Sequence, residues 1–357
     1  MTRRAIARIE RGAALLAAML TVTLVATFAA AALWQQWRSI EVEAAERARV
    51  QSAWVLIGAL DWSRLILRED ARAGAVAGAG SGTDHLAEPW AVPLAEAKLT
   101  SFLAADKNIS SDALAGLPEA FLSGRIVDAQ SKLNVMNLVQ NGRPIPEQVD
   151  IFRKLFELLG LPAGELPLLT RNLQQALAGI DLAALGAASA ASAASAAASA
   201  PVRAMATADA GANAPLLPQQ TSQLVWLGLS SASAAALEPY VTVLPPGTRL
   251  NINTASAEAM FASVEKLDLA SAKRVVEARM RSHFKTVQDA NKLLTGAGQF
   301  DDNRHSVASS FFDVRGRLRL ENTWVEEHSL LQRGQNFEVT TIWRERGAGT
   351  TTEALKP

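Results

Sequence analysis

The residue types that most often carry chemistry are few in this chain of 357 residues, and they are spread along it. The sequence contains no Gly-x-Ser-x-Gly elbow, no Walker A loop and no His-Glu-x-x-His pair, and it has no cysteine to serve as a metal ligand or a nucleophile. Its four histidines stand far apart, which favours structural or surface roles: His85, His283, His305 and His328. We therefore predict that the chain is not an enzyme.

One short acidic run offers ligands for a metal ion. Asp301, Asp302 and Asn303 are consecutive, and calcium prefers hard oxygen ligands of this kind. A solvated loop or a helix cap uses the same residue types. We favour the loop or cap, and calcium at these three positions is the weaker alternative; no other cofactor is predicted.

The charge and the length of the chain limit its partners and its organisation. It carries 35 basic and 35 acidic residues, whereas a protein whose main partner is nucleic acid normally has a strongly positive field. The balance of charges therefore argues against binding to nucleic acid. The length exceeds what one small core organises, so we expect at least two folded units beside any targeting segment.

The elements that position these residues begin with a membrane anchor. Four arginines precede an uncharged run at residues 13–33. As a helix, these roughly 21 residues would be about 31 Å long, which is enough to cross the hydrocarbon core of a bilayer. The arginines favour a cytoplasmic N-terminus, and Trp34 and Trp37 suit the outer interface. We expect a single-pass inner-membrane helix with the remaining chain in the periplasm.

The boundary between the basic segment and the apolar run contains a candidate processing site. It has the sequence Arg11-Gly12-Ala13-Ala14-Leu15-Leu16, which resembles the recognition site of prepilin peptidases. That resemblance implies a leader at residues 1–12 that ends at Gly12, and a mature N-terminus at Ala13 that becomes methylated. A secretory signal peptide that is cut near residues 29–32 is the alternative.

The residue at position 17 indicates which group of pilin-like proteins the chain resembles. Most pilins and pseudopilins carry a glutamate as the fifth mature residue, whereas this chain has Ala17. A carboxylate inside the membrane is costly unless it is paired, so a subunit without it offers no such pairing to the subunit beneath it. Absence of this glutamate is typical of minor pseudopilin K of type II secretion systems, and the chain resembles that family.

Strong helix formers continue beyond the membrane over residues 34–73, with apolar residues at helical spacing. A glycine-rich stretch then predicts the end of the helix. Residues 74–143 are expected to form the first part of a pilin-like domain, with Trp90 in its core. A β-hairpin is predicted at 124–138, with its turn after Asp128.

An inserted α-helical domain is expected at residues 144–306, where the apolar spacing becomes helical. The segment 183–218 is dominated by alanine and serine and is predicted to be disordered. Residues 250–295 resemble a helix-hairpin-helix, with Thr254 placed to cap the first helix and a second helix that begins near Ala270.

Helix-hairpin-helix pairs often bind DNA through a Gly-x-Gly turn, which lets backbone amides approach the phosphates. The turn here reads Lys266-Leu267-Asp268-Leu269-Ala270, so it lacks both glycines and adds a negative charge. We therefore predict no nucleic-acid partner. A membrane-anchored DNA receptor of the competence type remains the alternative function.

The C-terminal region is predicted to form antiparallel strands. Residues 307–346 contain three β-type segments, with turns expected near Gly316, Asn322 and Gly334. Residues 347–357 are expected to be a flexible tail.

The resemblance to the pseudopilin K family covers nearly the whole chain and implies its fold and function. The implied fold is α+β: a pilin-like domain in which a long N-terminal transmembrane helix packs on an antiparallel sheet, plus a large inserted α-helical domain. The implied function is to cap the tip of the periplasmic pseudopilus during export of folded proteins. The implied partners are the other minor pseudopilins, the major pseudopilin shaft, prepilin peptidase, the secretion platform and the inner membrane. Assembly through helix packing in lipid is expected at Ala14, Leu15, Leu16, Ala17 and Leu20.

Overall fold

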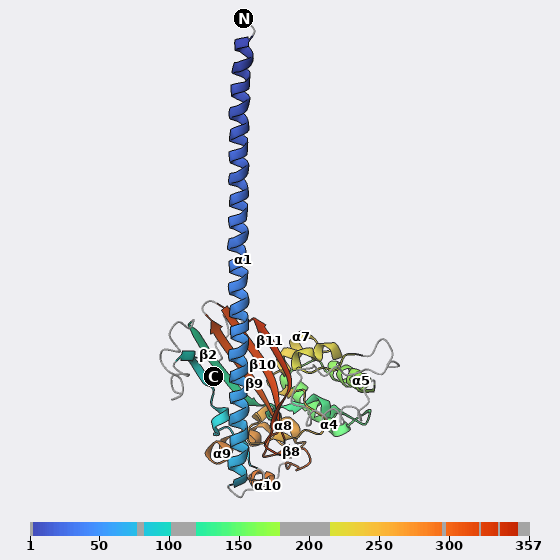
Figure 1. The fold of residues 1–357 in the computed structure, drawn as a ribbon. Coiled ribbons are helices and arrows are strands. Elements are labelled where there is room, and N and C mark those ends of the chain that lie inside the picture. Colours follow the sequence, from blue (N-terminus) through green and yellow to red (C-terminus); the bar gives the residue numbers. More distant parts are fainter. Residues whose placement is uncertain are drawn as a thin grey trace. The chain divides into compact units, whose positions relative to one another are not determined.

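The computed structural model describes residues 3–76, 82–100, 119–178, 215–294, 298–320, 323–334 and 336–348. The chain divides into two compact units, Met1–Gly58 and Ala59–Pro357. Helix α1, Arg3–Val76, begins in the first unit and ends in the second (Figure 1). The segment predicted to be disordered, 183–218, lies outside the described residues except for 215–218.

The first unit contains the predicted membrane anchor. Within the described residues, α1 is the helix that is long and apolar enough to cross a membrane, with a window of mean hydropathy 2.2 that is not buried at all. The helix includes both the span at 13–33 and its continuation at 34–73 without a break. It also includes the predicted leader from Arg3 onward.

The second unit is built on a five-stranded antiparallel sheet with the strand order β1-β2-β9-β10-β11 (Figure 1). The three C-terminal strands are those that the sequence predicts, although β11 extends through Gly347 and Ala348 into the expected tail. The strands are β1 Leu94–Lys98, β2 Ala120–Asp128, β9 Phe311–Leu320, β10 Thr323–Arg333 and β11 Val339–Ala348.

One face of this sheet packs on the C-terminal part of α1. Leu60 and Leu67 of α1 form a buried cluster with Phe312 and Leu331 of the sheet and with Trp90. Trp90 belongs to the short 3-10 helix η1, Pro89–Ala91, and its ring packs edge-on against Phe312, as expected for a core residue. Successive residues of a strand point to opposite faces of the sheet. Phe312 and Leu331 point to the face that α1 covers, which places them in this cluster.

The predicted turn near Gly316 is wrong, because β9 continues through that residue. Gly316 pairs with Gly124 of β2. A Cβ atom on Gly124 would lie 3.0 Å from the carbonyl oxygen of Arg315. The glycines therefore permit a close approach of two strands, which is a second common use of glycine in a sheet.

The predicted hairpin at 124–138 is also wrong. Strand β2 pairs with β1 and β9, and the chain after Asp128 turns away from the sheet. Asp128 causes this change of direction, because its side chain accepts a hydrogen bond from the backbone amide of Gln130 at 2.8 Å. The following segments are η2 Ala129–Ser131, β3 Leu133–Asn134, which pairs in parallel with β6 Val241–Thr242, and η3 Val135–Leu138.

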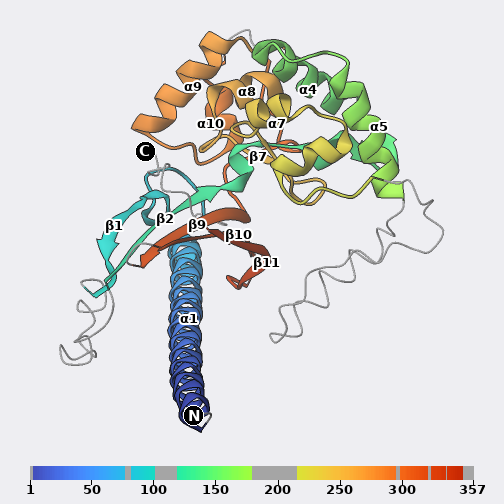
Figure 2. The ribbon, with the colours of Figure 1, turned by 90° about the horizontal axis from the view of Figure 1, so that it is seen from above.

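The inserted domain begins earlier than predicted, because its single apolar core already includes Leu133 and Val135. Figure 2 shows its helices gathered into one body beside the sheet. They are α4 Pro146–Leu159, α5 Glu165–Ala178, η4 Thr221–Leu227, α7 Ser231–Leu237, α8 Ala257–Ser263, α9 Leu269–Arg281 and α10 Val287–Asn291. Short strand pairs join them: β4 Val139–Gln140 with β5 Arg143–Pro144, and β7 Leu250–Asn251 with β8 His305–Ser306.

Candidate functional site

The predicted assembly residues lie on α1, where Ala13 to Leu20 are exposed. An α-helix turns by about 100° per residue, so Ala13, Leu16, Ala17 and Leu20 share one face. Ala14 and Leu15 point away from that face, although the prediction grouped them with it. A partner helix that contacts Leu16 therefore cannot contact Leu15 in the same way.

The predicted calcium residues lie in the loop before β8, and their side chains are engaged locally. Asp301 accepts a hydrogen bond from the backbone amide of Asn303 at 3.0 Å, and its other oxygen lies 3.6 Å from Arg304. Asp302 accepts a hydrogen bond from Gln288 at 2.8 Å. These contacts are those of a structured loop, and calcium at this position remains a prediction.

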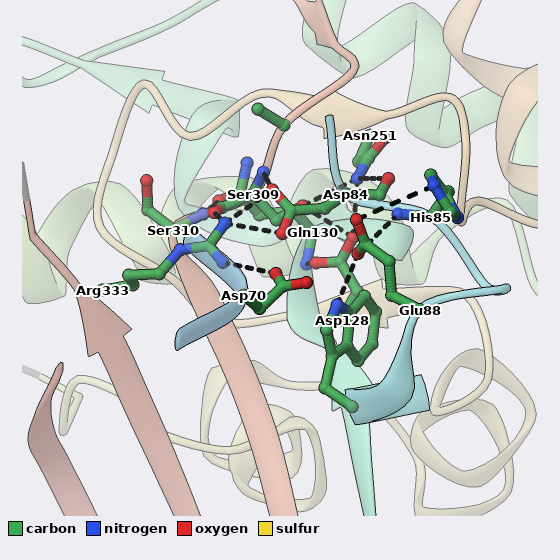
Figure 3. A network of polar contacts seen from close by, with 12 residues as sticks. Asp70, Asp84, His85, Glu88, Asp128, Gln130, Asn251, Ser309, Ser310 and Arg333 are labelled. Atoms are coloured by element: carbon green, nitrogen blue, oxygen red, sulfur yellow. Dashed lines mark hydrogen bonds and ion pairs between the residues drawn. The ribbon is translucent and has the colours of Figure 1, made fainter. Parts of the chain in front are cut away.

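The most concentrated polar chemistry lies elsewhere, at the junction between the sheet and the inserted domain (Figure 3). Asp128, at the end of β2, is only 1% exposed. One of its oxygens accepts hydrogen bonds from Thr254 at 2.6 Å, Asn251 at 2.9 Å and Ser309 at 2.6 Å. Since Thr254 and Asn251 belong to the inserted domain, this carboxylate joins the domain to the sheet. Thr254 is thus not the cap of α8; Ser256 has that role.

Arg333 of β10 supplies the positive charge at the junction. Its guanidinium lies 2.6 Å from both carboxylate oxygens of Asp84 and 3.2 Å from Asp70 of α1. It also donates to the backbone carbonyl of Ser309 at 2.8 Å. Figure 3 shows Arg333 reaching toward Asp70 and Asp84. Three elements that are distant in the sequence are therefore held by one cation.

Glu88 extends the cluster toward the inserted domain. It accepts hydrogen bonds from the indole of Trp90 at 2.5 Å and from the backbone amide of His85 at 3.1 Å. The ring of His85 stacks on that of His283, with 3.9 Å between the ring centroids. His283 follows α9, so this stack is a second contact between the two parts of the unit.

Burial sets the protonation of these acids. Desolvation, followed by repulsion from Asp70, raises the pKa of Glu88 to about 7. Desolvation also raises the pKa of Asp128 to about 6, against the lowering effect of its hydrogen bonds to Ser309 and Thr254. Desolvation is also the largest cause that raises the pKa values of Asp70 and Asp84.

These shifts predict a pH dependence of stability. An acid with a raised folded pKa binds protons more tightly in the folded chain, so its stabilising contribution is complete below its ordinary pKa and is lost as the pH rises through the folded value. Glu88 and Asp128 should therefore make the chain about 1–2 kcal/mol more stable at pH 6 than at pH 8. Thermal unfolding of wild type and Glu88→Gln at both pH values measures this. If Glu88→Gln keeps the full difference in stability between pH 6 and pH 8, other groups cause that difference.

The acids Asp70, Asp84 and Glu88 bring oxygen atoms within 4.8 Å of one another, a spacing that could hold a metal ion. However, Arg333 already contacts both Asp70 and Asp84. A guanidinium in this position supplies the charge that a cation would bring. We interpret the group as a buried ion-pair cluster that fastens the junction.

One contact in the inserted domain has the form of a catalytic dyad. His305 lies 3.0 Å from the hydroxyl of Ser263. Both residues are buried, at 0% and 3% exposure, and burial lowers the pKa of His305 to about 4. A nucleophile needs access to its substrate, so this pair is structural.

Comparison with known proteins shows which family the chain resembles. The family models for type II secretion system (T2SS), protein K, match residues 131–246 and 250–308. The type II secretion system protein K of Pseudomonas aeruginosa is 28% identical over 346 residues, which cover 95% of this chain and 94% of that protein. The chain is therefore similar to the type II secretion system protein K family in two adjacent segments, and to this relative along nearly its whole length. These similarities support a minor pseudopilin of the type II secretion system, and that family is structural.

A solved structure supports the fold. The GspK-GspI-GspJ complex from the type 2 secretion system of enterotoxigenic Escherichia coli contains a chain that matches 85% of this chain and 98% of its own length, at 18% identity and a TM-score of 0.55. The α+β fold predicted from the sequence is thereby confirmed, with its N-terminal apolar helix and antiparallel sheet.

The helix-hairpin-helix segment lies within the second family match, and its turn is closed. The ammonium group of Lys154 in α4 donates to the carbonyls of Phe261 at 2.8 Å, Val264 at 2.7 Å and Glu265 at 3.1 Å. A Cβ on Gly298 would lie 3.2 Å from the amide nitrogen of Lys266. The chain itself thus covers the turn through which a DNA-binding hairpin would approach a phosphate.

The charge of the hairpin turn also has a structural use. Asp268 accepts a hydrogen bond from the backbone amide of Ser271 at 2.6 Å and caps the start of α9. An acid at a helix N-terminus is favourable, so the residue that weakens the case for phosphate binding stabilises this hairpin. Both observations support a scaffolding role.

Lys154 provides a direct test of that role. Replacement of Lys154 by methionine keeps the length of the side chain but leaves three carbonyls at the end of α8 without their donor. We expect a loss of about 1–3 kcal/mol of stability, measured as the free energy of unfolding in urea. Arg153→Met, which changes an exposed residue of the same helix, is the matched control. Equal stability of the two variants would contradict the assignment.

Proposed function

We propose that this pseudopilin caps the tip of the periplasmic pseudopilus and takes part in the export of folded proteins across the outer membrane. In this proposal it is cleaved after Gly12, methylated at Ala13 and held in the inner membrane by residues 13–33, with its N-terminus cytoplasmic and its folded domain periplasmic. The observation that carries the proposal is the exposed apolar stretch of α1 in a chain that resembles the protein K family. Such a surface needs lipid or another helix to cover it.

The partners are proposed by analogy with the related complex. The Escherichia coli chain was solved together with GspI and GspJ, so we propose that this chain also assembles with other minor pseudopilins. The major pseudopilin shaft and the inner-membrane secretion platform would lie below it. Ala17, in place of the usual glutamate, suits a subunit at the end of the filament, because such a subunit offers no buried carboxylate for pairing.

Processing by prepilin peptidase is the first test. Intact mass and N-terminal sequencing of the chain are compared between cells with and without the peptidase. A mature N-terminus at Ala13 that depends on the peptidase supports the proposal. Cleavage near residue 32, or no cleavage, would contradict it and would favour the membrane-anchored DNA receptor.

Calcium at Asp301, Asp302 and Asn303 is a separate proposal, supported by the type and the order of these oxygen ligands. Binding to the folded chain should raise Tm as the calcium concentration increases. The expected result is an increase in wild type that is absent in Asp301→Asn/Asp302→Asn. An equal response of both proteins would place the ion elsewhere.

A further inference from the structure

A cavity of about 330 Å³ lies between the sheet and the inserted domain. Its sheet wall is the face that points away from α1, because Leu331 packs on α1 whereas its neighbour Leu330 packs on the inserted domain. The strand register places His328 opposite Glu345 and Leu330 opposite Trp343, so these side chains share that wall. A cavity of this volume is large enough for a small ligand or for one side chain of a partner.

The charges on the β9 side of the cavity balance one another. Arg315 of β9 lies 3.7 Å from a carboxylate oxygen of Glu238 and 3.5 Å from one of Asp313. The ammonium group of Lys132 donates to the backbone carbonyl of Glu238 at 2.7 Å. Two cations and two carboxylates therefore meet on this side, which leaves no excess charge there to attract a ligand.

The β11 side of the cavity is acidic. Within the described part of the chain, Glu326 of β10 makes no hydrogen bond or ion pair, and Glu345 of β11 accepts from the neutral amide of Gln220 at 2.6 Å. Arg317 lies opposite Glu326 in the ladder, but its guanidinium lies over the ring of Trp324, 5.0 Å from the centroid. Glu326 and Glu345 are diagonal neighbours, which lie about 7–8 Å apart. Both carboxylates can therefore reach one cation between them.

The same cavity is lined by side chains with unsatisfied polar atoms. Among the described residues, the indole nitrogen of Trp343 and the Oδ1 atom of Asp313 are buried without a hydrogen-bond partner. The other oxygen of Asp313 lies 2.7 Å from Nε2 of His328, and the ring of His328 packs edge-on against Trp343 with 4.7 Å between centroids. Buried polar groups without partners are costly. A ligand that supplies a donor and an acceptor, after small rotations of these side chains, would remove that cost.

These features select the chemistry of the ligand. Two carboxylates beside an aromatic ring attract a cation. A guanidinium is planar, carries five donors and stacks on aromatic rings, whereas an ammonium group is a compact point charge. The peptide groups next to an arginine side chain add an N–H for Asp313 and a carbonyl for the indole of Trp343. An arginine in an exposed segment of another protein has all of these groups.

We propose that this cavity binds an arginine side chain of a partner protein, with the guanidinium held between Glu326 and Glu345 beside the ring of Trp343. The inference rests on the groups that line the cavity and does not depend on the proposed function.

Fluorine NMR of the full chain in detergent micelles provides the test. The chain has eight tryptophans, all replaced by fluorotryptophan, and the resonance of Trp343 is the one that Trp343→Phe removes. The probe is N-acetyl-arginine amide, which carries the guanidinium and a peptide group on each side. N-acetyl-citrulline amide has nearly the same shape without the charge. The arginine probe should shift the Trp343 resonance in a saturable manner, and the citrulline probe should not.

Removal of the two carboxylates should weaken this binding. In Glu326→Gln/Glu345→Gln the affinity for the arginine probe should fall by about tenfold, because charge-assisted hydrogen bonds are lost. Glu157→Gln/Glu277→Gln is the matched control, since it removes the same charge from two exposed acids on helices of the inserted domain. The control should bind the arginine probe as wild type does.

The proposal is overturned if the arginine probe leaves the Trp343 resonance unmoved or if the citrulline probe shifts it equally. It is also overturned if Glu326→Gln/Glu345→Gln binds the arginine probe as tightly as the control. Should this double variant fail to fold, as judged by circular dichroism, Glu345→Gln alone is used, and it must weaken binding more than Glu277→Gln does.

Discussion

Replacement of Asp128 by alanine is expected to lower the free energy of unfolding by about 3–5 kcal/mol, the range found when one partner of a buried polar network is removed. Thr254, Asn251 and Ser309 all donate to one oxygen of this carboxylate. Alanine would leave these buried donors unpaired, and each such group costs about 1–3 kcal/mol. Removal of a buried charge offsets part of that loss.

Thermal unfolding followed by near-ultraviolet circular dichroism measures this change, and we expect a decrease in Tm of about 10 °C. Asp150→Ala is the matched control, because Asp150 is a 58% exposed acid of the inserted domain that pairs with Arg153 on its own helix. Asp128→Asn should fall between alanine and wild type at pH 8, since it retains an acceptor oxygen and carries no charge. If Asp128→Ala were as stable as the control, the junction would have no role in holding the fold.

The second large effect is expected in the membrane. A glutamate at Leu16 should strongly reduce co-purification with the other minor pseudopilins, because a carboxylate inside the membrane is costly unless it is paired and cannot enter an apolar helix contact. Leu16 is 70% exposed on the face that it shares with Ala13, Ala17 and Leu20. Pulldown from detergent extracts of membranes that contain all the minor pseudopilins provides the measurement.

Leu15→Glu separates loss of the contact from loss of membrane insertion. Leu15 is 65% exposed and points away from the face of Leu16, so both variants carry the same cost of insertion. We expect Leu15→Glu to retain more of the partners. Equal loss in both variants would mean that insertion alone is affected, and unchanged co-purification of Leu16→Glu would contradict the proposed contact.

The predictions that succeeded concern features with a local physical cause. An uncharged run that is long enough, as a helix, to cross a bilayer forms an apolar helix whatever the rest of the chain does. Alternation of apolar residues likewise predicted the three C-terminal strands. The predictions that failed concern residues with two common uses. Gly316 suits a turn or a close strand pair, and Asp128 suits a hairpin turn or an exit from the sheet; the choice depends on partners far along the chain.

The sequence by itself determined the long apolar N-terminal helix, the α+β class, the helical insertion and the resemblance to pseudopilin K, because composition and periodicity act over a few turns or strands. Only the tertiary structure decided the junction. Asp128 meets Thr254, 126 positions away, and Asp84 meets Ser309 and Arg333, 225 and 249 positions away. No local pattern marks a polar residue whose partners are this distant. Such residues come together only when the sheet and the inserted domain have both folded, and the removal of water at that contact strengthens the hydrogen bonds that join the two parts.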